Sequence, residues 1–174
     1  TEADFSQRPF RVTGYNGEYL GETVIVATGA SVRHLEVPGE EEFSGRGVSY
    51  CATCDGHFFR DKALYVVGGG DSALKEGPFP TRYANSVTVV HRRDQLRAGA
   101  YLQEKARENP KMDFLWDTIV TGIRGNDTVE SVILKNKQTG EERESAIDGV
   151  FIFIGHIPNT GLFEGQLDMD ERGY

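Results

Sequence analysis

A short apolar run followed at once by closely spaced glycines limits most strongly what this chain can fold into. Residues 63–67 are Ala-Leu-Tyr-Val-Val, which has the length and composition of a buried strand, and residues 68–73 are Gly-Gly-Gly-Asp-Ser-Ala. A strand, a Gly-x-Gly-x-x-Ala turn and the start of a helix are together typical of a dinucleotide-binding β-α-β unit. Residues 86–90, Ser-Val-Thr-Val-Val, supply the second strand. The sequence therefore predicts an α/β fold with a Rossmann-like parallel sheet.

The small residues of this turn are candidates for cofactor binding. Gly68 permits a tight turn, Gly70 permits close approach of a pyrophosphate, and Ala73 permits close packing of helix on strand. Asp71 and Ser72 stand at the start of the expected helix, where free N–H groups can bind an anion. A plain glycine-rich turn in an α/β protein is the alternative interpretation.

The crossover helix expected from residue 72 to about residue 83 is interrupted in the sequence. Gly77, Pro78 and Pro80 fall in its middle, and an interior proline costs roughly 3 kcal/mol. We expect either two short helical pieces or a second half that begins near Pro80.

A basic cluster follows the second predicted strand. It consists of His91, Arg92 and Arg93, with Arg97 nearby. An NAD enzyme usually carries an acidic residue at this place, whereas guanidinium groups suit a phosphate. Because the chain has a net charge of −8, this local excess of positive charge predicts a cofactor with a 2′-phosphate, NADPH. A solvated basic patch is the alternative.

The only two cysteines of the chain lie three positions apart in the motif Cys51-Ala-Thr-Cys54-Asp55-Gly. Two such thiols can close a small disulfide ring and exchange disulfides, and Asp55 could move a proton during exchange. The alternatives are inert buried thiols or half a zinc site completed by His34 or His57. A structural zinc site needs four ligands and a second cysteine pair is absent, so we expect redox chemistry and no metal.

The remaining segments predict further strands, one helix and two junctions. A hairpin around Asn16-Gly17 joins strands at 10–13 and 19–27, and a helix at 98–108 is stopped by Asn109-Pro110. Strands at 112–116, 118–124 and 129–135 suggest an antiparallel meander, and 149–154 is a fully apolar strand. Residues 37–47 and 155–160 are Gly/Pro-containing junctions suited to domain boundaries.

Composition excludes several classes of protein. The net charge of −8 argues against broad nucleic-acid or anionic-membrane binding, and no run reaches the ~18 apolar residues of a membrane helix. Scarce cysteine with one C-x-x-C motif is typical of cytosolic redox chemistry, so we expect a cytoplasmic protein. The first residue is not an initiator and no closing element precedes Tyr174, so we also expect a piece of a longer protein.

The order and spacing of these motifs resemble one known family. The cysteine motif, the glycine turn, His91-Arg-Arg-Asp94 and Gly155-His-Ile-Pro-Asn-Thr160 together look like the middle of a low-molecular-weight, bacterial-type thioredoxin reductase. The resemblance covers essentially the whole chain.

The resemblance implies a two-domain flavoprotein in which an NADPH-binding domain is inserted into an FAD-binding domain. Residues 1–32 would be the tail of the first FAD-domain segment, with Thr28 and Gly29 near its edge. Residues 33–156 would form the NADPH-binding domain, and 157–174 would begin the second FAD-domain segment, with Gly155 at the junction. The family passes hydride from NADPH to FAD, then reduces the Cys51–Cys54 disulfide and finally thioredoxin, and it is homodimeric.

Two departures from the family pattern qualify these expectations. The N-terminal Gly-x-Gly-x-x-Gly for FAD is missing, so this chain alone is expected to hold no FAD, and the prolines interrupt a helix that is continuous in the family. Three rivals remain: an NADH-using hydroperoxide-reductase flavoprotein, a ferredoxin–NADP reductase, which would lack the cysteine pair, and a non-enzymatic NADPH-binding redox module.

Overall fold

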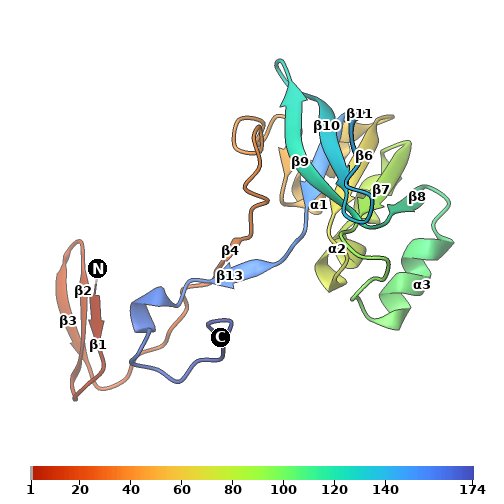
Figure 1. Ribbon diagram of the computed structural model, residues 1–174. Coiled ribbons are helices and arrows are strands. Elements are labelled where there is room, and N and C mark those ends of the chain that lie inside the picture. The colour runs from red at the N-terminus through yellow and green to blue at the C-terminus, as the bar shows by residue number, and fades with distance from the viewer. Residues whose placement is uncertain (1) are drawn as a thin grey trace. The chain divides into compact units, whose positions relative to one another are not determined.

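The computed structural model describes residues 2–174, which form two compact units (Figure 1). Unit 1 runs to Val32 and resumes from His156 to Tyr174, and unit 2 is the continuous segment Arg33–Gly155. Among the described residues, no helix is both long and apolar enough to cross a membrane. Each unit has its own sheets and its own buried contacts.

Unit 2 is built on a five-stranded parallel sheet in the order β5-β12-β6-β7-β8 (Figure 1). Its strands are β5 (Val48–Ser49), β12 (Gly149–Ile152), β6 (Ala63–Val67), β7 (Ser86–Val90) and β8 (Met112–Leu115). The predicted strands at 63–67 and 86–90 are confirmed with their bounds, and the strand predicted at 149–154 ends two residues early. The parallel, Rossmann-like sheet is therefore present.

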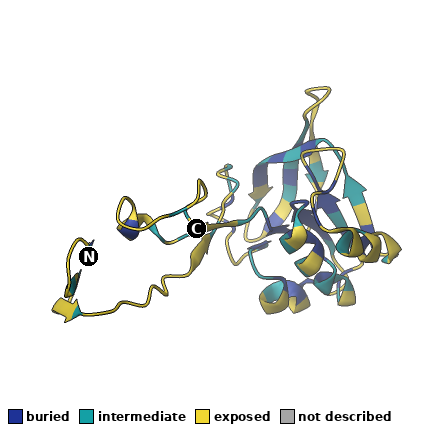
Figure 2. Ribbon diagram, turned by 90° about the horizontal axis from the view of Figure 1, so that it is seen from below, coloured by how far each residue is buried: buried dark blue, intermediate teal, exposed yellow. Residues whose placement is uncertain are grey.

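Helices and a second sheet cover the two faces of the parallel sheet. Alternate residues of β6 point to opposite faces, since side chains alternate along a strand. One face packs on α2 (Asp71–Glu76) and α3 (Ala100–Glu108), through Leu64, Val66, Ala73, Leu74 and Ala106. The other packs on β9 (Thr118–Gly125) and β10 (Val129–Asn136), through Tyr65, Val67, Val120, Val132 and Leu134. Figure 2 shows the buried positions gathered in these strands.

The predicted antiparallel meander is confirmed. Strand β10 pairs with β9 and with β11 (Glu142–Ala146), so the order is β11-β10-β9. The predicted turns at residues 125–127 and 138–140 join these strands. This second sheet closes unit 2 on the side away from the helices.

The crossover between β6 and β7 consists of two short helical pieces, which confirms the first of the two alternatives predicted for residues 72–83. Helix α2 ends at its cap residue Gly77, and the 3₁₀ helix η2 (Phe79–Arg82) begins after Pro78. Lys111 donates to the carbonyl oxygens of Thr81 (3.0 Å) and Ala84 (2.7 Å), which satisfies the end of η2. Lys111, in the turn just before β8, thus supplies donors to the carbonyl groups that the interrupted helix leaves unpaired.

Unit 1 contains the predicted hairpin with a shifted turn and a shorter second strand. Strands β1 (Glu2–Asp4), β2 (Phe10–Gly14) and β3 (Gly17–Gly21) form one antiparallel sheet, and β4 (Ala30–Val32) pairs with β13 (His156–Pro158). The strand predicted over 19–27 was too long, because β3 ends at Gly21 and residues 22–29 pair with no described strand. Ile25 is accordingly 92% exposed.

Candidate active site

The two cysteines form a disulfide at the start of a short helix. Cys51 is the cap residue of α1 (Ala52–Asp55), and its Cα lies 5.3 Å from that of Cys54. The backbone N–H of Cys54 donates to Sγ of Cys51 at 3.2 Å. Cys54 is exposed and Cys51 is half-buried. A donor aimed at sulfur stabilises a thiolate, so this geometry favours thiolate character at Cys51 once the disulfide is open.

Asp55 is held in place by a serine that the sequence analysis did not single out. The buried hydroxyl of Ser49 donates to Oδ2 of Asp55 at 2.6 Å and accepts the N–H of Cys51 at 3.1 Å. One hydroxyl therefore fixes both the carboxylate and the backbone of the first cysteine. The available signal was a serine two residues before Cys51, a spacing at which hydroxyls bond the backbone locally.

A groove of about 180 Å³ opens beside Asp55. Its lining includes the aromatic ring of Phe58, which is 68% exposed, and the cationic side chains of Arg46 and Lys62. The dithiol segment thus borders a surface that offers both an apolar ring and positive charge.

The glycine turn after β6 needs glycine at two positions for steric reasons. Gly68 has φ of +144°, and a Cβ there would lie 2.3 Å from the carbonyl oxygen of Phe153. A Cβ on Gly69 would lie 2.3 Å from Nδ1 of His91. At Gly70 the nearest atom to a Cβ would be a guanidinium nitrogen of Arg97 at 3.8 Å, so space remains there for a ligand. The sequence motif assigned no role to Gly69.

The loop after β7 is bound tightly to this turn. The carbonyl oxygen of Gly69 accepts the N–H groups of Arg97 (2.7 Å) and Ala98 (3.2 Å). Oδ1 of Asp71 accepts the N–H of Gly99 at 2.8 Å. The structure thereby brings together Gly68, Gly70, Asp71, Ser72 and Ala73 with the basic loop. Asp71 contributes by fixing that loop.

His91 is not a third cation of the basic cluster, which corrects the expectation stated for it. The ring is only 4% exposed, and its Nε2 donates to the carbonyl oxygen of Gln95 at 3.1 Å. Burial lowers the pKa of His91 below its ordinary 6.5 and outweighs the hydrogen bond to Gln95, which acts to raise it; the positive charges of three nearby arginines lower the pKa further. The ring is therefore neutral at pH 7, and Arg92, Arg93 and Arg97 are exposed and near enough for their charge to act on it.

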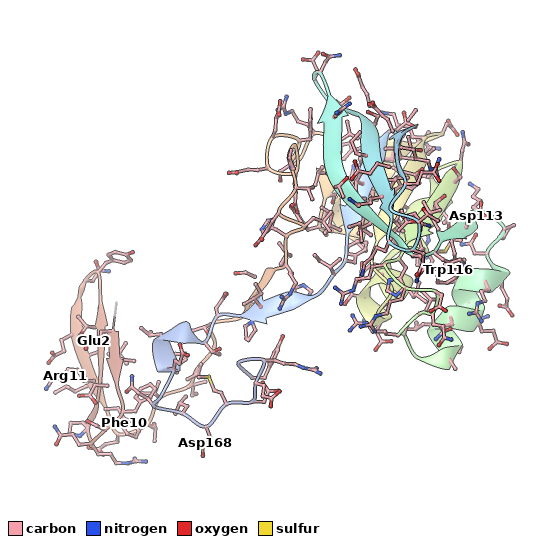
Figure 3. The ribbon with its side chains drawn as sticks, in the orientation of Figure 1. Glu2, Phe10, Arg11, Asp113, Trp116 and Asp168 are labelled. Carbon is pink, nitrogen blue, oxygen red and sulfur yellow. A yellow bond between two sulfur atoms is a disulfide. The ribbon has the colours of Figure 1, made fainter. Side chains whose placement is uncertain are left out.

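Aromatic packing holds His91 from the other side. Trp116, which follows β8 and is labelled in Figure 3, meets His91 edge-on with 6.5 Å between ring centroids. Trp116 in turn stacks on Phe114 at 5.2 Å. A buried neutral ring thus anchors an exposed basic loop, and these residues fit a dinucleotide that carries an additional phosphate.

A Gly69→Ala substitution is expected to lower the free energy of unfolding by about 2 to 3 kcal/mol, because its methyl group would overlap the buried His91 ring. Gly99→Ala is the matched control, since a Cβ there meets nothing nearer than 3.9 Å. Urea unfolding of both variants measures the difference. Equal stability of the two would contradict the packing of His91 on Gly69.

Stability is also expected to fall as the pH drops below 6.5. The unfolded chain takes up a proton on His91 near its ordinary pKa of 6.5, whereas the folded protein, with a lowered pKa, resists protonation. The contribution of His91 is therefore complete above 6.5 and declines until the folded-state pKa is reached. Urea unfolding between pH 7.5 and 5 should show a smaller decline in a His91→Gln variant. Parallel curves for the two proteins would refute this assignment.

The remaining predicted residues lie outside this cluster. Thr28 and Gly29 belong to unit 1. The side-chain N–H of Asn159 donates to the carbonyl oxygen of Thr28, and its backbone N–H donates to that of Gly29, both at 3.0 Å. Gly155 ends unit 2 with φ of +112°, and its carbonyl oxygen accepts the N–H of Arg33 at 3.0 Å. Within the described residues, no group of three or more His, Cys, Asp or Glu side chains is placed to hold a metal ion.

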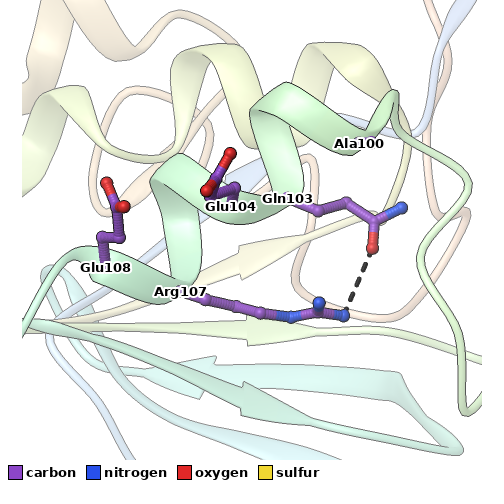
Figure 4. Close-up of a pocket in the computed structure, with 5 residues that line it drawn as sticks. All are labelled: Ala100, Gln103, Glu104, Arg107 and Glu108. Atoms are coloured by element: carbon purple, nitrogen blue, oxygen red, sulfur yellow. Dashed lines mark hydrogen bonds between the residues drawn. The ribbon is translucent and has the colours of Figure 1, made fainter.

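A wider hollow, of about 340 Å³, lies along α3 and contains none of the predicted site residues (Figure 4). It is lined by Ala100, Gln103, Glu104, Arg107 and Glu108. Arg107 donates to Gln103 one turn earlier at 3.2 Å. The lining comes from a single exposed helix, so the hollow offers no convergent chemistry.

Known proteins are similar to this chain in both sequence and fold. Thioredoxin reductase of Peptoclostridium litorale is 47% identical over 179 residues, which cover 99% of this chain and 57% of that protein. Thioredoxin reductase of Mycolicibacterium smegmatis is 53% identical over 151 residues, covering 87% and 49%. The crystal structure of Lactococcus lactis thioredoxin reductase in its FR conformation has a TM-score of 0.92 at 42% identity and covers 100% of this chain and 58% of that one.

The chain thus spans about half the length of the curated relatives that it matches. These relatives are thioredoxin reductases, as the resemblance in the sequence predicted. The family model of the pyridine nucleotide-disulphide oxidoreductases matches residues 1–174. The chain belongs to the pyridine nucleotide-disulphide oxidoreductase family.

Proposed function

We propose that the whole protein is a thioredoxin-disulfide reductase, which passes electrons from NADPH through FAD to the Cys51–Cys54 disulfide and on to thioredoxin. The observation that carries this proposal is the presence, in unit 2, of an accessible C-x-x-C disulfide together with a glycine turn bordered by exposed arginines. The matched relatives are thioredoxin reductases, which supports the same assignment.

In this proposal unit 2 is the NADPH-binding domain and unit 1 is part of an FAD-binding domain. Arg92 and Arg93 bind the 2′-phosphate, and the open space at Gly70 admits the pyrophosphate. Thr28, Gly29 and Gly155 remain candidates for contacts with cofactor in the whole protein. NADPH and FAD, when bound, supply the two electrons that open the disulfide.

The residues of this chain then carry out thiol–disulfide exchange. A thiolate of the reduced pair attacks one sulfur of the thioredoxin disulfide, so a mixed disulfide forms as the thioredoxin S–S bond breaks. The other cysteine attacks that mixed disulfide, which re-forms the Cys51–Cys54 bond and releases the second thioredoxin sulfur. The two released thiolates take up two protons. Asp55, fixed by Ser49, is the nearby group that can move them.

The groove beside Asp55 is the proposed docking place for thioredoxin. An exposed Phe58 ring flanked by Arg46 and Lys62 suits a partner surface with apolar and acidic character. The resemblance to thioredoxin reductases further supports a homodimer of the whole protein, and the isolated C-x-x-C motif supports a cytoplasmic location.

The test is NADPH consumption by the full-length protein in the presence of oxidised thioredoxin. Sustained consumption that stops when thioredoxin is omitted is the expected result. NADPH binding without thioredoxin reduction would instead indicate a non-enzymatic redox module. Equal use of NADH would contradict the 2′-phosphate assignment and favour the hydroperoxide-reductase type.

A further inference from the structure

A buried carboxylate with no part in the proposed chemistry lies between the start of unit 2 and the dithiol. Glu40 is only 3% exposed. Its Oε1 accepts the N–H of Leu35 at 3.0 Å and the hydroxyl of Tyr50 at 2.8 Å, and its Oε2 accepts the N–H of Glu36 at 2.7 Å. Burial acts to raise the pKa of Glu40, but these hydrogen bonds outweigh it and the pKa lies below its ordinary value. Glu40 is therefore an anion with three donors.

The carboxylate of Glu40 binds the backbone of the segment with which unit 2 begins. Leu35 lies two residues after Arg33, where unit 2 begins. Glu36 has φ of +60°, a left-handed conformation that disfavours residues other than glycine. Successive N–H groups that converge on one anion are a recurrent way to stabilise such a backbone. The carboxylate of Glu40 thus holds this connector in its observed path.

The same carboxylate reaches the dithiol through Tyr50, the residue before Cys51. Burial raises the pKa of Tyr50, and the hydrogen bond and charge of Glu40 raise it further, so its hydroxyl remains a donor. His34 joins the same group, with its Nδ1 at 2.9 Å from the Tyr50 hydroxyl and 3.4 Å from Oε1 of Glu40. Glu40, Tyr50 and His34 are called the Glu40 clasp below.

We propose that Glu40 is a positioning residue for the dithiol: the Glu40 clasp ties the residue before Cys51 to the start of unit 2 and so holds Cys51 where its sulfur meets that of Cys54. The inference rests on the proposed function only for the redox role of the cysteines. Ser49 fixes the backbone of Cys51 from within β5, and the clasp fixes Tyr50 from the connector. If Tyr50 is released, Cys51 and the strand before it, β5, gain conformational freedom in the reduced protein. The disulfide then closes less readily.

The test is the dithiol–disulfide equilibrium of the full-length protein in buffers of dithiothreitol and its oxidised form. Each dithiothreitol gives two electrons and two protons to the disulfide and becomes a cyclic disulfide. Alkylation and mass spectrometry of the peptide that contains Cys51 and Cys54 measure the reduced fraction. Neither NADPH nor thioredoxin takes part, so failure of the proposed function would leave this equilibrium measurable and unaffected.

Tyr50→Phe removes only one hydroxyl, and Glu40→Gln replaces one acceptor oxygen with an NH₂ group that faces donors. We expect both to raise the equilibrium constant for reduction by about threefold to tenfold. Each removes or weakens the hydrogen bond from Tyr50 to the Glu40 carboxylate, and hydrogen bonds to a charged group are stronger than neutral ones. A tenfold rise is about 30 mV in the potential of a two-electron couple. Tyr65→Phe is the matched control, since its hydroxyl bonds Ser145 at 2.8 Å, away from the clasp.

Amide hydrogen exchange separates positioning from general destabilisation. The N–H groups of Leu35 and Glu36 should lose protection in Glu40→Gln and keep it in Tyr50→Phe and Tyr65→Phe. An unchanged equilibrium in Tyr50→Phe would overturn the proposal. An equal shift in Tyr65→Phe would also overturn it, because the effect would then reflect any lost hydroxyl. Since Tyr50 is only half-buried, Tyr50→Phe keeps the test informative even if Glu40→Gln does not fold.

Discussion

Replacing both Arg92 and Arg93 with glutamine in the full-length protein is expected to weaken NADPH binding about 100-fold, because two charge-assisted contacts to a phosphate are lost. NADH lacks that phosphate, so its affinity should stay within about twofold. Both side chains are exposed, and both lie close enough to His91 for their charge to lower its pKa. Calorimetric titration with each nucleotide measures the two affinities.

A pair of arginines elsewhere in unit 2 provides the matched control. Arg60 and Arg107 are exposed, and neither belongs to the loop after β7. Substituting both with glutamine removes the same charge and should leave the preference for NADPH intact. If the control lost NADPH affinity to the same extent, the effect would come from net charge. Equal losses for NADPH and NADH in the Arg92/Arg93 variant would show that these residues do not contact the 2′-phosphate.

The strands predicted with their exact bounds are those for which the local sequence pattern was sufficient. The run 63–67 is continuously apolar, and the run 86–90 has its three valines buried; both lie inside the parallel sheet, covered on both faces. The break in the crossover was equally predictable, since Pro78 excludes a regular helix whatever packs around it.

The error in unit 1 shows the limit of the same reasoning. The run that contains Ile25 is as apolar as β6, yet it is exposed, because an apolar pattern states that burial is favourable without naming a partner. Strand β3 ends at Gly21, where its pairing with β2 ends. Strand pairing depends on two segments, and the pattern of one segment does not identify the strand with which it pairs.

The candidate site divides in the same way. The cysteine motif and the glycine turn are local, so spacing alone identified them. Ser49 is also local, since its hydroxyl bonds Cys51 and Asp55, but it lies outside the recognised motif. Gly69 and the neutral state of His91 depend instead on contacts across the fold, such as the His91 ring over Gly69 and the charge of the nearby arginines. No spacing rule places a histidine from the end of β7 against a glycine after β6, because their packing follows from the parallel register of the two strands.

Serine in place of either cysteine is expected to lower thioredoxin reduction by roughly a thousandfold or more, as loss of a nucleophile generally does. The disulfide between Cys51 and Cys54 cannot form in either variant, so each exchange stops at the mixed disulfide or never begins. In the full-length protein, reduction of the flavin by NADPH should persist, because the proposed nucleotide-binding residues lie on a different loop. Stopped-flow absorbance follows the flavin, and insulin-coupled turnover follows thioredoxin.

The two variants also distinguish the roles of the two sulfurs. The variant that retains the attacking cysteine should accumulate a mixed disulfide with thioredoxin, visible on a non-reducing gel, whereas the other should not. Thr53→Ser is the control, since it places a serine between the cysteines, keeps the hydroxyl that lies 3.5 Å from Sγ of Cys51 and leaves both thiols in place. Full turnover by either cysteine-to-serine variant would disprove a role for the pair in exchange. Loss of flavin reduction in both variants would show instead that the cysteines maintain the fold. In the proposed sequence the disulfide receives electrons from the flavin, so the disulfide is not required for NADPH to reduce the flavin.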